Sequence, residues 1–163
     1  MRTSLLPGLQ TALSLYRLDM ASELVFVGDA GTTEAGRPSR RVGFELANYC
    51  KLSDWLTIDA DLAFAQARFK DNAPEGRRIP GAVEGVASLV VALDKLGPWS
   101  GALQLRYFGP RPLTEDNTVR SKATTLLNGH VGYKFGPKWR LELEGFTVEP
   151  GCLVRTGCGN IGP

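Results

Sequence analysis

The chain has 163 residues, enough for one domain with a sizeable core, and carries 19 basic and 17 acidic residues for a net charge of +2. This near balance excludes a strongly basic surface for nucleic acid, so we expect no nucleic-acid partner. No apolar run reaches the roughly 18 residues that a transmembrane helix needs. The 19 glycines and 10 prolines favour strands and turns over a helical bundle.

Alternating apolar and polar residues predict eight β-strands, each with one apolar and one polar face. The predicted strands cover residues 9–19, 23–27, 40–51, 55–69, 81–93, 100–107, 124–135 and 139–145. The pattern is clearest in 55–69, where Leu56, Ile58 and Leu62 lie opposite Asp59 and Asp61. The predicted fold class is therefore all-β, an antiparallel meander of about eight strands.

Short turns and long loops alternate along these strands. The long loops, rich in glycine, proline and polar residues, cover 28–38, 71–80 and 110–122. Trp55, Trp99 and Trp139 each follow a short turn, 44 and 40 residues apart. Strands of about ten residues with short turns on one side and long loops on the other are typical of an outer-membrane barrel. We expect the three tryptophans to lie in its aromatic girdle.

Alternation does not say which face is wet, so a second fold class stays open. In a membrane barrel, the polar side chains would line the lumen; Asp59, Asp61, Arg106 and His130 are the candidates. In a soluble, lipocalin-like ligand-binding barrel, the apolar face would point inward instead. A self-contained membrane barrel of eight strands is a third alternative.

The residues indicate no enzyme, so we assign no catalytic residues. Asp59 and Asp61 have no histidine or third carboxylate near them in the pattern, which favours a solvated wall over acid–base chemistry. The G-x-S-x-G signature is absent, and GDAGTTEAG lacks the GK[ST] of a phosphate loop. With one histidine and three cysteines that form no CxxC pair, we expect no metal and no cofactor.

Several stretches of the sequence resemble the C-terminal part of the β-barrel of TonB-dependent receptors. They are GDAGTTEAGRPSRR with VGFELANY, WLTIDADLAFAQARF, RIPGAVEG and LRYFGPRPLTEDNTVRSKATTLLNGHVGYKF. The resemblance covers residues 5–146 and implies part of a 22-stranded outer-membrane barrel with a plugged lumen. It implies uptake of scarce substrates such as siderophores, with long loops outside and short turns in the periplasm of a bacterium.

The rest of the chain departs from this family. Residues 147–163 (TVEPGCLVRTGCGNIGP) show no alternation, and we expect an anomalous, disordered tail. We find no plug domain, TonB-contacting segment or signal peptide, so the sequence predicts a fragment of a larger barrel. We expect both ends of its strand set on the long-loop side, and no transport by the fragment alone. Contact with the TonB complex would run through the plug of the parent receptor.

The resemblance also gives a meaning to the basic residues near the loops. Six of them are candidates for contact with an anionic ligand: Arg40, Arg41, Arg77, Arg78, Arg111 and Arg120. They could meet an anionic siderophore or the phosphates of lipopolysaccharide. The expected partners are thus outer-membrane lipid and lipopolysaccharide, and the expected location is the bacterial outer membrane.

Overall fold

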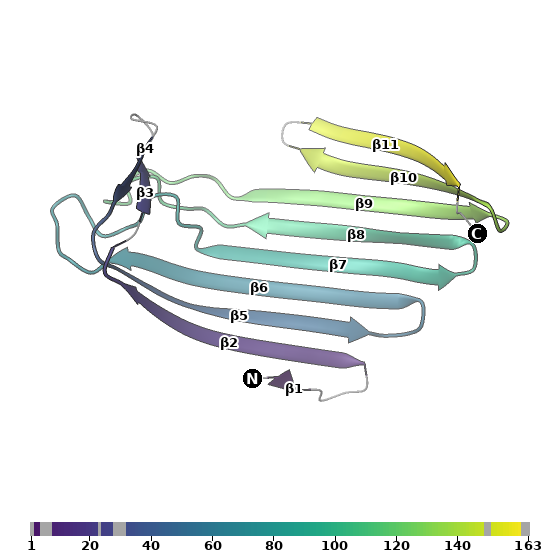
Figure 1. The fold of residues 1–163 in the computed structure, drawn as a ribbon, viewed down its shortest axis with the longest axis horizontal. Helices are drawn as coiled ribbons and strands as arrows, with labels where there is room; N and C mark the ends of the chain where they lie inside the picture. The colour runs from purple at the N-terminus through teal and green to yellow at the C-terminus, as the bar shows by residue number, and fades with distance from the viewer. Residues whose placement is uncertain (1, 4–7, 23, 28–31, 149–150, 161–163) are drawn as a thin grey trace.

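A computed structural model describes residues 2–3, 8–22, 24–27, 32–148 and 151–160. These residues form a nine-stranded antiparallel sheet and a separate hairpin of two strands (Figure 1). The large sheet contains, in spatial order, β1 (Arg2–Thr3), β2 (Leu9–Met20), β5 (Ser39–Lys51), β6 (Leu56–Phe69), β7 (Gly85–Leu96), β8 (Trp99–Phe108), β9 (Thr124–Phe135), β10 (Trp139–Val148) and β11 (Gly151–Asn160). The predicted all-β meander is confirmed.

The sheet is a single open layer (Figure 1). The chain exposes 11278 Å² of surface, against about 8,000 Å² for a compact globular protein of its 17.7 kDa. The buried apolar residues of the described part are Ala67, Phe69 and Ile79, a small cluster at the long-loop end of the sheet. The strands therefore bury little of their apolar surface within the chain.

Cross-strand register sorts the side chains onto two faces. Rows of apolar residues run across the sheet, for example Leu13–Leu46–Leu62 and Leu89–Leu105–Leu127. We call the side that carries these rows the leucine face and the opposite side the polar face. Leu15 on this face is 76% exposed and Leu103 is 52% exposed. A lipocalin-like barrel would pack these leucines in a dry interior, and the structure differs from that alternative.

The short turns and long loops lie at opposite ends of the strands, as Figure 1 shows. Two of the short turns use glycine in the left-handed region, Gly97 with φ 61° and Gly136 with φ 69°, where other residues are strained. Lys51 Nζ donates to Asp54 Oδ1 at 2.8 Å across the turn between β5 and β6. We call the two ends the short-turn rim and the long-loop rim.

The predicted strand 23–27 does not belong to the large sheet. Residues Leu24–Val27 form β3, which pairs with β4 (Thr32–Ala35) in a hairpin inside the long connection from β2 to β5. A strand does form at residues 24–27, but its predicted place in the meander was wrong, because alternation and apolar content do not identify a strand's partner. Four residues are also too few for the roughly ten that cross a bilayer. Residues 23 and 28–31 lie outside the described part.

Because this hairpin belongs to a loop, seven of the eight predicted strands run the height of the sheet: β2 and β5 to β10. Strand β2 begins at the short-turn rim, and β10 ends at the long-loop rim (Figure 1). The expectation that both ends of the strand set lie on the long-loop side is therefore wrong.

Two boundaries also differ from the sequence analysis. Strand β7 begins at Gly85 rather than at residue 81, since residues 81–84 belong to the loop and Glu84 forms ion pairs there. The expected disordered tail contains β11, whose backbone pairs with β10 from Val148↔Gly151 to Trp139↔Asn160. The domain boundary near residue 146 stays a prediction. No helix among the described residues has the length and apolar character to cross a membrane.

Candidate functional site

The polar face brings together the four residues predicted to face a lumen. Asp61 pairs in register with Ser88, and Ser88 pairs with Arg106. Asp59 lies two residues before Asp61 on β6, and His130 lies on the same face of β9. The four side chains thus share one surface, while their function as lumen residues stays a prediction. Within the described ranges, no three acidic, histidine or cysteine side chains gather as metal ligands would.

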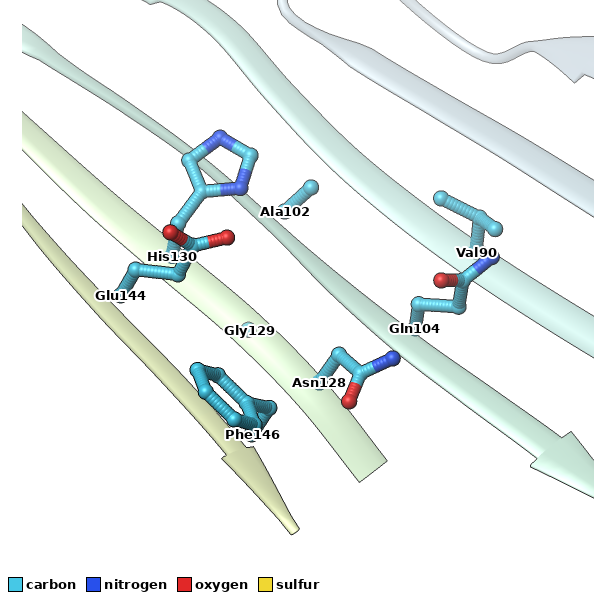
Figure 2. A pocket seen from close by; sticks show the side chains of 8 residues that line it. All are labelled: Val90, Ala102, Gln104, Asn128, Gly129, His130, Glu144 and Phe146. Carbon is cyan, nitrogen blue, oxygen red and sulfur yellow. The ribbon is translucent and has the colours of Figure 1, made fainter. Parts of the chain in front are cut away.

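A shallow hollow on this face crosses β7 to β10 (Figure 2). Its lining residues are Val90, Ala102, Gln104, Asn128, Gly129, His130, Glu144 and Phe146. The imidazole of His130 and the carboxylate of Glu144 project from register partners on β9 and β10. The amides of Gln104 and Asn128 form a second register pair on β8 and β9. The hollow is therefore lined by hydrogen-bonding side chains from three consecutive strands, β8 to β10, beside Val90 of β7.

The side chains of this hollow can form hydrogen bonds with a polar solute. Each amide offers both donors and an acceptor. With its amide oxygen turned toward Arg106, Gln104 accepts hydrogen bonds from Arg106 Nε and Nη2 at 3.2 Å. These groups can exchange hydrogen bonds with water or solute.

Arg37 connects the three long loops at the long-loop rim. Its Nη1 donates to Asp71 Oδ1 at 3.1 Å, and its Nη2 donates to the Gly76 carbonyl at 3.0 Å and to the Glu115 carboxylate. The guanidinium also lies 4.1 Å from the centroid of the Phe69 ring. One side chain thus joins the loops before β5, after β6 and after β8.

Backbone hydrogen bonds between two of these loops support the same arrangement. The Arg78 amide donates to the Glu115 carbonyl at 2.9 Å, and the Gly81 amide donates to the Pro112 carbonyl at 2.9 Å. Pro112 is fully buried, and Ile79 is 4% exposed. The long loops after β6 and β8 therefore pack on each other as one layer.

Glu84 neutralises two of the predicted ligand contacts. It accepts from Arg78 Nη1 at 2.6 Å and from Arg120 Nη2 at 2.5 Å. Arg120 also donates to Asn117 Oδ1 at 2.6 Å and to the Pro110 carbonyl at 3.1 Å. Both arginines are engaged inside the loop layer, where they hold the loops together.

The other four candidates lie apart from this pair. Arg40 donates to Asp19 Oδ1 at 2.8 Å, on the leucine face. Arg77 lines the same hollow as Arg40 at the long-loop rim. Arg41 lies on the polar face of β5, and Arg111 is exposed. The six arginines do not form one site, and their contact with a ligand stays a prediction.

Sequence reasoning missed Arg37 and Glu84, the two residues that organise the loops. Arg37 lies in a predicted loop whose composition indicated only solvent exposure, and Glu84 falls in the predicted strand 81–93. Arg37 meets a partner 78 positions away in Glu115, a pairing that no local pattern encodes. Each lies one or two positions before a strand of the structure, Arg37 before β5 and Glu84 before β7.

The three tryptophans lie together at the short-turn rim. Trp99 and Trp139 begin β8 and β10, and each is more than half exposed. The Trp99 ring lies 4.7 Å from the Tyr133 ring, and Tyr133 lies 4.7 Å from Phe135. Such exposed aromatic residues at one height have the arrangement of a membrane girdle, and that role stays a prediction.

Comparison with solved structures shows the same fold in parts of two receptors and a copper transporter. The ferric-catecholate import receptor Fiu of E. coli K12 aligns with TM-score 0.70 and 16% identity, covering 92% of this chain and 22% of that protein. The siderophore receptor PiuA of Acinetobacter baumannii aligns with TM-score 0.64 and 16% identity, covering 85% and 21%. The copper transporter OprC aligns with TM-score 0.60 and 17% identity, covering 85% and 22%. At these identities the likeness concerns the fold, and the chain spans about a fifth of each structure.

The antiparallel meander and its two faces define the class: the strands are arranged as in the wall of an outer-membrane-type β-barrel. The sequence also matches the family described as "TonB dependent receptor-like, beta-barrel" over residues 5–147. The chain belongs to this family. The resemblance noted in the sequence is thereby confirmed.

Proposed function

We propose that the chain forms part of the wall of an outer-membrane receptor that takes up siderophores or similarly scarce substrates. The observation that carries this proposal is an uncovered leucine face backed by a polar face, in a member of the TonB-dependent receptor family. In lipid, every backbone group needs a partner, so a strand of this kind must lie in a closed barrel. The open edges of this sheet support its place in a larger one.

In this proposal, the leucine face contacts lipid hydrocarbon and the polar face borders the lumen. The short-turn rim lies toward the periplasm, with its tryptophans at headgroup depth. The long loops lie outside, where they help to capture ligand. We assign the wall no catalytic step and no cofactor.

The proposed partners follow from this placement. The leucine face meets outer-membrane lipid, and the outer rim meets lipopolysaccharide. The TonB complex would act through the plug of the parent receptor and not through these strands.

Extraction and refolding of the expressed chain test the proposal. The expressed chain should leave membranes or inclusion bodies only with detergent or denaturant, and it should refold only into micelles or vesicles. A monodisperse, folded monomer in plain buffer would instead support the soluble, lipocalin-like alternative. Heat-modifiable migration of the isolated chain would support a self-contained small barrel.

The substrate class needs a separate measurement. Deletion of the gene that encodes the chain should lower uptake of ⁵⁵Fe-labelled catecholate siderophore by the host under iron limitation, with Cu²⁺ uptake as the comparison. Loss of copper uptake alone would contradict the siderophore assignment.

A further inference from the structure

A basic hollow lies at the long-loop rim, next to the leucine face. Its lining residues are Arg40, Val42, Gln66, Arg68, Phe69, Lys70 and Arg77. Four of these seven side chains are cations, and none is a carboxylate. We call this group of residues the basic hollow.

Register shows which face its strand residues occupy. The row Leu15–Phe44–Phe64 belongs to the leucine face, and Arg17–Val42–Gln66 is the next row on that side. The row after it is Asp19–Arg40–Arg68. The leucine face thus changes within two rows from apolar residues to cations as it approaches the long-loop rim. A boundary of this kind matches the step from acyl chains to charged headgroups in a bilayer.

Charges in this region are not balanced. Asp19 accepts from Arg17 Nε at 2.9 Å and from Arg40 Nε at 2.8 Å, and its carboxylate lies 3.5 Å from Lys70 Nζ. One carboxylate therefore serves three cations, with Arg68 beside them. The Nε atom of Arg68 is buried and has no hydrogen-bond partner among the residues that the structure describes. A buried donor without a partner costs free energy that an anion would recover.

The loop layer provides the contrast. There Arg37 is paired with two carboxylates, and Arg78 and Arg120 share Glu84. Those cations are satisfied inside the chain, whereas the basic hollow keeps an excess of positive charge on the side of the leucine face. Arg40 and Arg68 lie on the opposite face from the hollow around His130, so a substrate in the lumen would not reach them.

We propose that the basic hollow binds the phosphate groups of a lipid in the outer leaflet, a phosphorylated glycolipid of the lipopolysaccharide type. Arg40, Arg68, Lys70 and Arg77 hold the phosphates, and the leucine face below them contacts the acyl chains. Guanidinium groups bind phosphate through paired N–H donors, and an ammonium adds a point charge. This inference rests on the proposed function, because it needs the leucine face in lipid and the long loops outside.

Lipid retention tests this site. The full chain is reconstituted in phosphatidylcholine vesicles that contain bisphosphorylated lipid A, and bound lipid A is measured after detergent extraction and purification. The variant Arg68→Gln/Lys70→Gln should retain lipid A at least about tenfold more weakly. The matched control Lys95→Gln/Lys138→Gln removes two exposed cations from the short-turn rim and should retain lipid A like the unmodified chain. The charge-preserving variant Arg68→Lys/Lys70→Arg should keep most of the binding.

Further measurements with other lipids and with inorganic phosphate identify which phosphate compound the basic hollow binds. Dephosphorylated lipid A and phosphatidylglycerol should each be retained poorly, and millimolar inorganic phosphate should not displace lipid A. Three results would overturn the proposal. The first is an equal loss of lipid A from Arg68→Gln/Lys70→Gln and from the control variant. The second is retention of dephosphorylated lipid A or phosphatidylglycerol as strong as that of lipid A, and the third is displacement of lipid A by inorganic phosphate. Failure of the chain to enter vesicles of phosphatidylcholine alone would instead count against the proposed function.

Discussion

The two faces of this sheet are built on different principles. On the leucine face, large apolar residues such as Leu105 and Leu127 lie exposed, and little in the chain packs on them. On the polar face, side chains pair and hydrogen-bond, and the loops at its end are joined by Arg37. In water, the leucine face would be a liability, whereas in lipid it is the outer surface of a barrel. The comparison shows that the surrounding solvent, and not packing within the chain, explains why the leucine face carries exposed apolar side chains.

A charge placed on each face in turn gives the largest expected effect. Leu127 and Asn128 are neighbours on β9 and point to opposite faces. In a bilayer, Leu127→Lys should destabilise the folded chain by about 2–4 kcal/mol, because an ammonium would enter hydrocarbon. Asn128→Lys, on the polar face, should cost little. Unfolding of the reconstituted variants in urea measures both, and equal costs would remove the distinction between the faces.

Two glycines sharpen the comparison at the level of packing. A Cβ on Gly43 would lie 2.5 Å from the Phe64 carbonyl oxygen and 2.6 Å from Tyr16 Oη, on the polar face. A Cβ on Gly145, on the leucine face, would meet nothing within 4 Å. Gly43→Ala should therefore lower the free energy of unfolding by about 1–3 kcal/mol, and Gly145→Ala should leave it nearly unchanged. Denaturant midpoints of the two variants provide the test, and a Gly145→Ala loss as large as that of Gly43→Ala would contradict it.

Removal of the Arg37 side chain tests how firmly the loops are held. Arg37→Met should cost about 1–2 kcal/mol, since it loses the partly exposed ion pairs and the contact with Phe69. Hydrogen exchange should accelerate at the amides of Arg78 and Gly81, which link the loops. Arg111→Met is the control, because Arg111 is exposed, and it should change neither quantity. Unchanged exchange in Arg37→Met would show that backbone contacts alone order the loops.

The smallest expected effect is a loss of stability of the loop after β8 at acid pH. Hydrogen bonds from Thr114 and then Thr118 lower the pKa of Asp116 below its usual 3.8. The folded state therefore prefers the carboxylate, and its contribution to loop stability is present above the unfolded pKa. It is lost as the pH falls through the lower, folded pKa. Exchange of the Thr118 amide should accelerate over this acid range, and Asp116→Asn should abolish the pH dependence that this carboxylate causes.

Sequence predicted most of the sheet and little of the loop layer. Alternation located the full-height strands, because each has one wet and one dry face, as Leu56, Asp59 and Asp61 illustrate. It failed for residues 23–27, where a short apolar segment forms a hairpin within a loop. Contacts such as that between Arg37 and Glu115 join residues far apart in the chain, and only the folded loops bring them together.

The solvent at the leucine face is the claim on which the account depends. Nitroxide labels at Leu127→Cys and Asn128→Cys, in a cysteine-free variant reconstituted in bilayers, measure it directly through collisions with oxygen and with a water-soluble nickel complex. We predict high oxygen and low nickel accessibility at position 127, and the reverse at position 128. High nickel accessibility at both positions, or a label at 127 that neither reagent reaches, would contradict a lipid-facing leucine face.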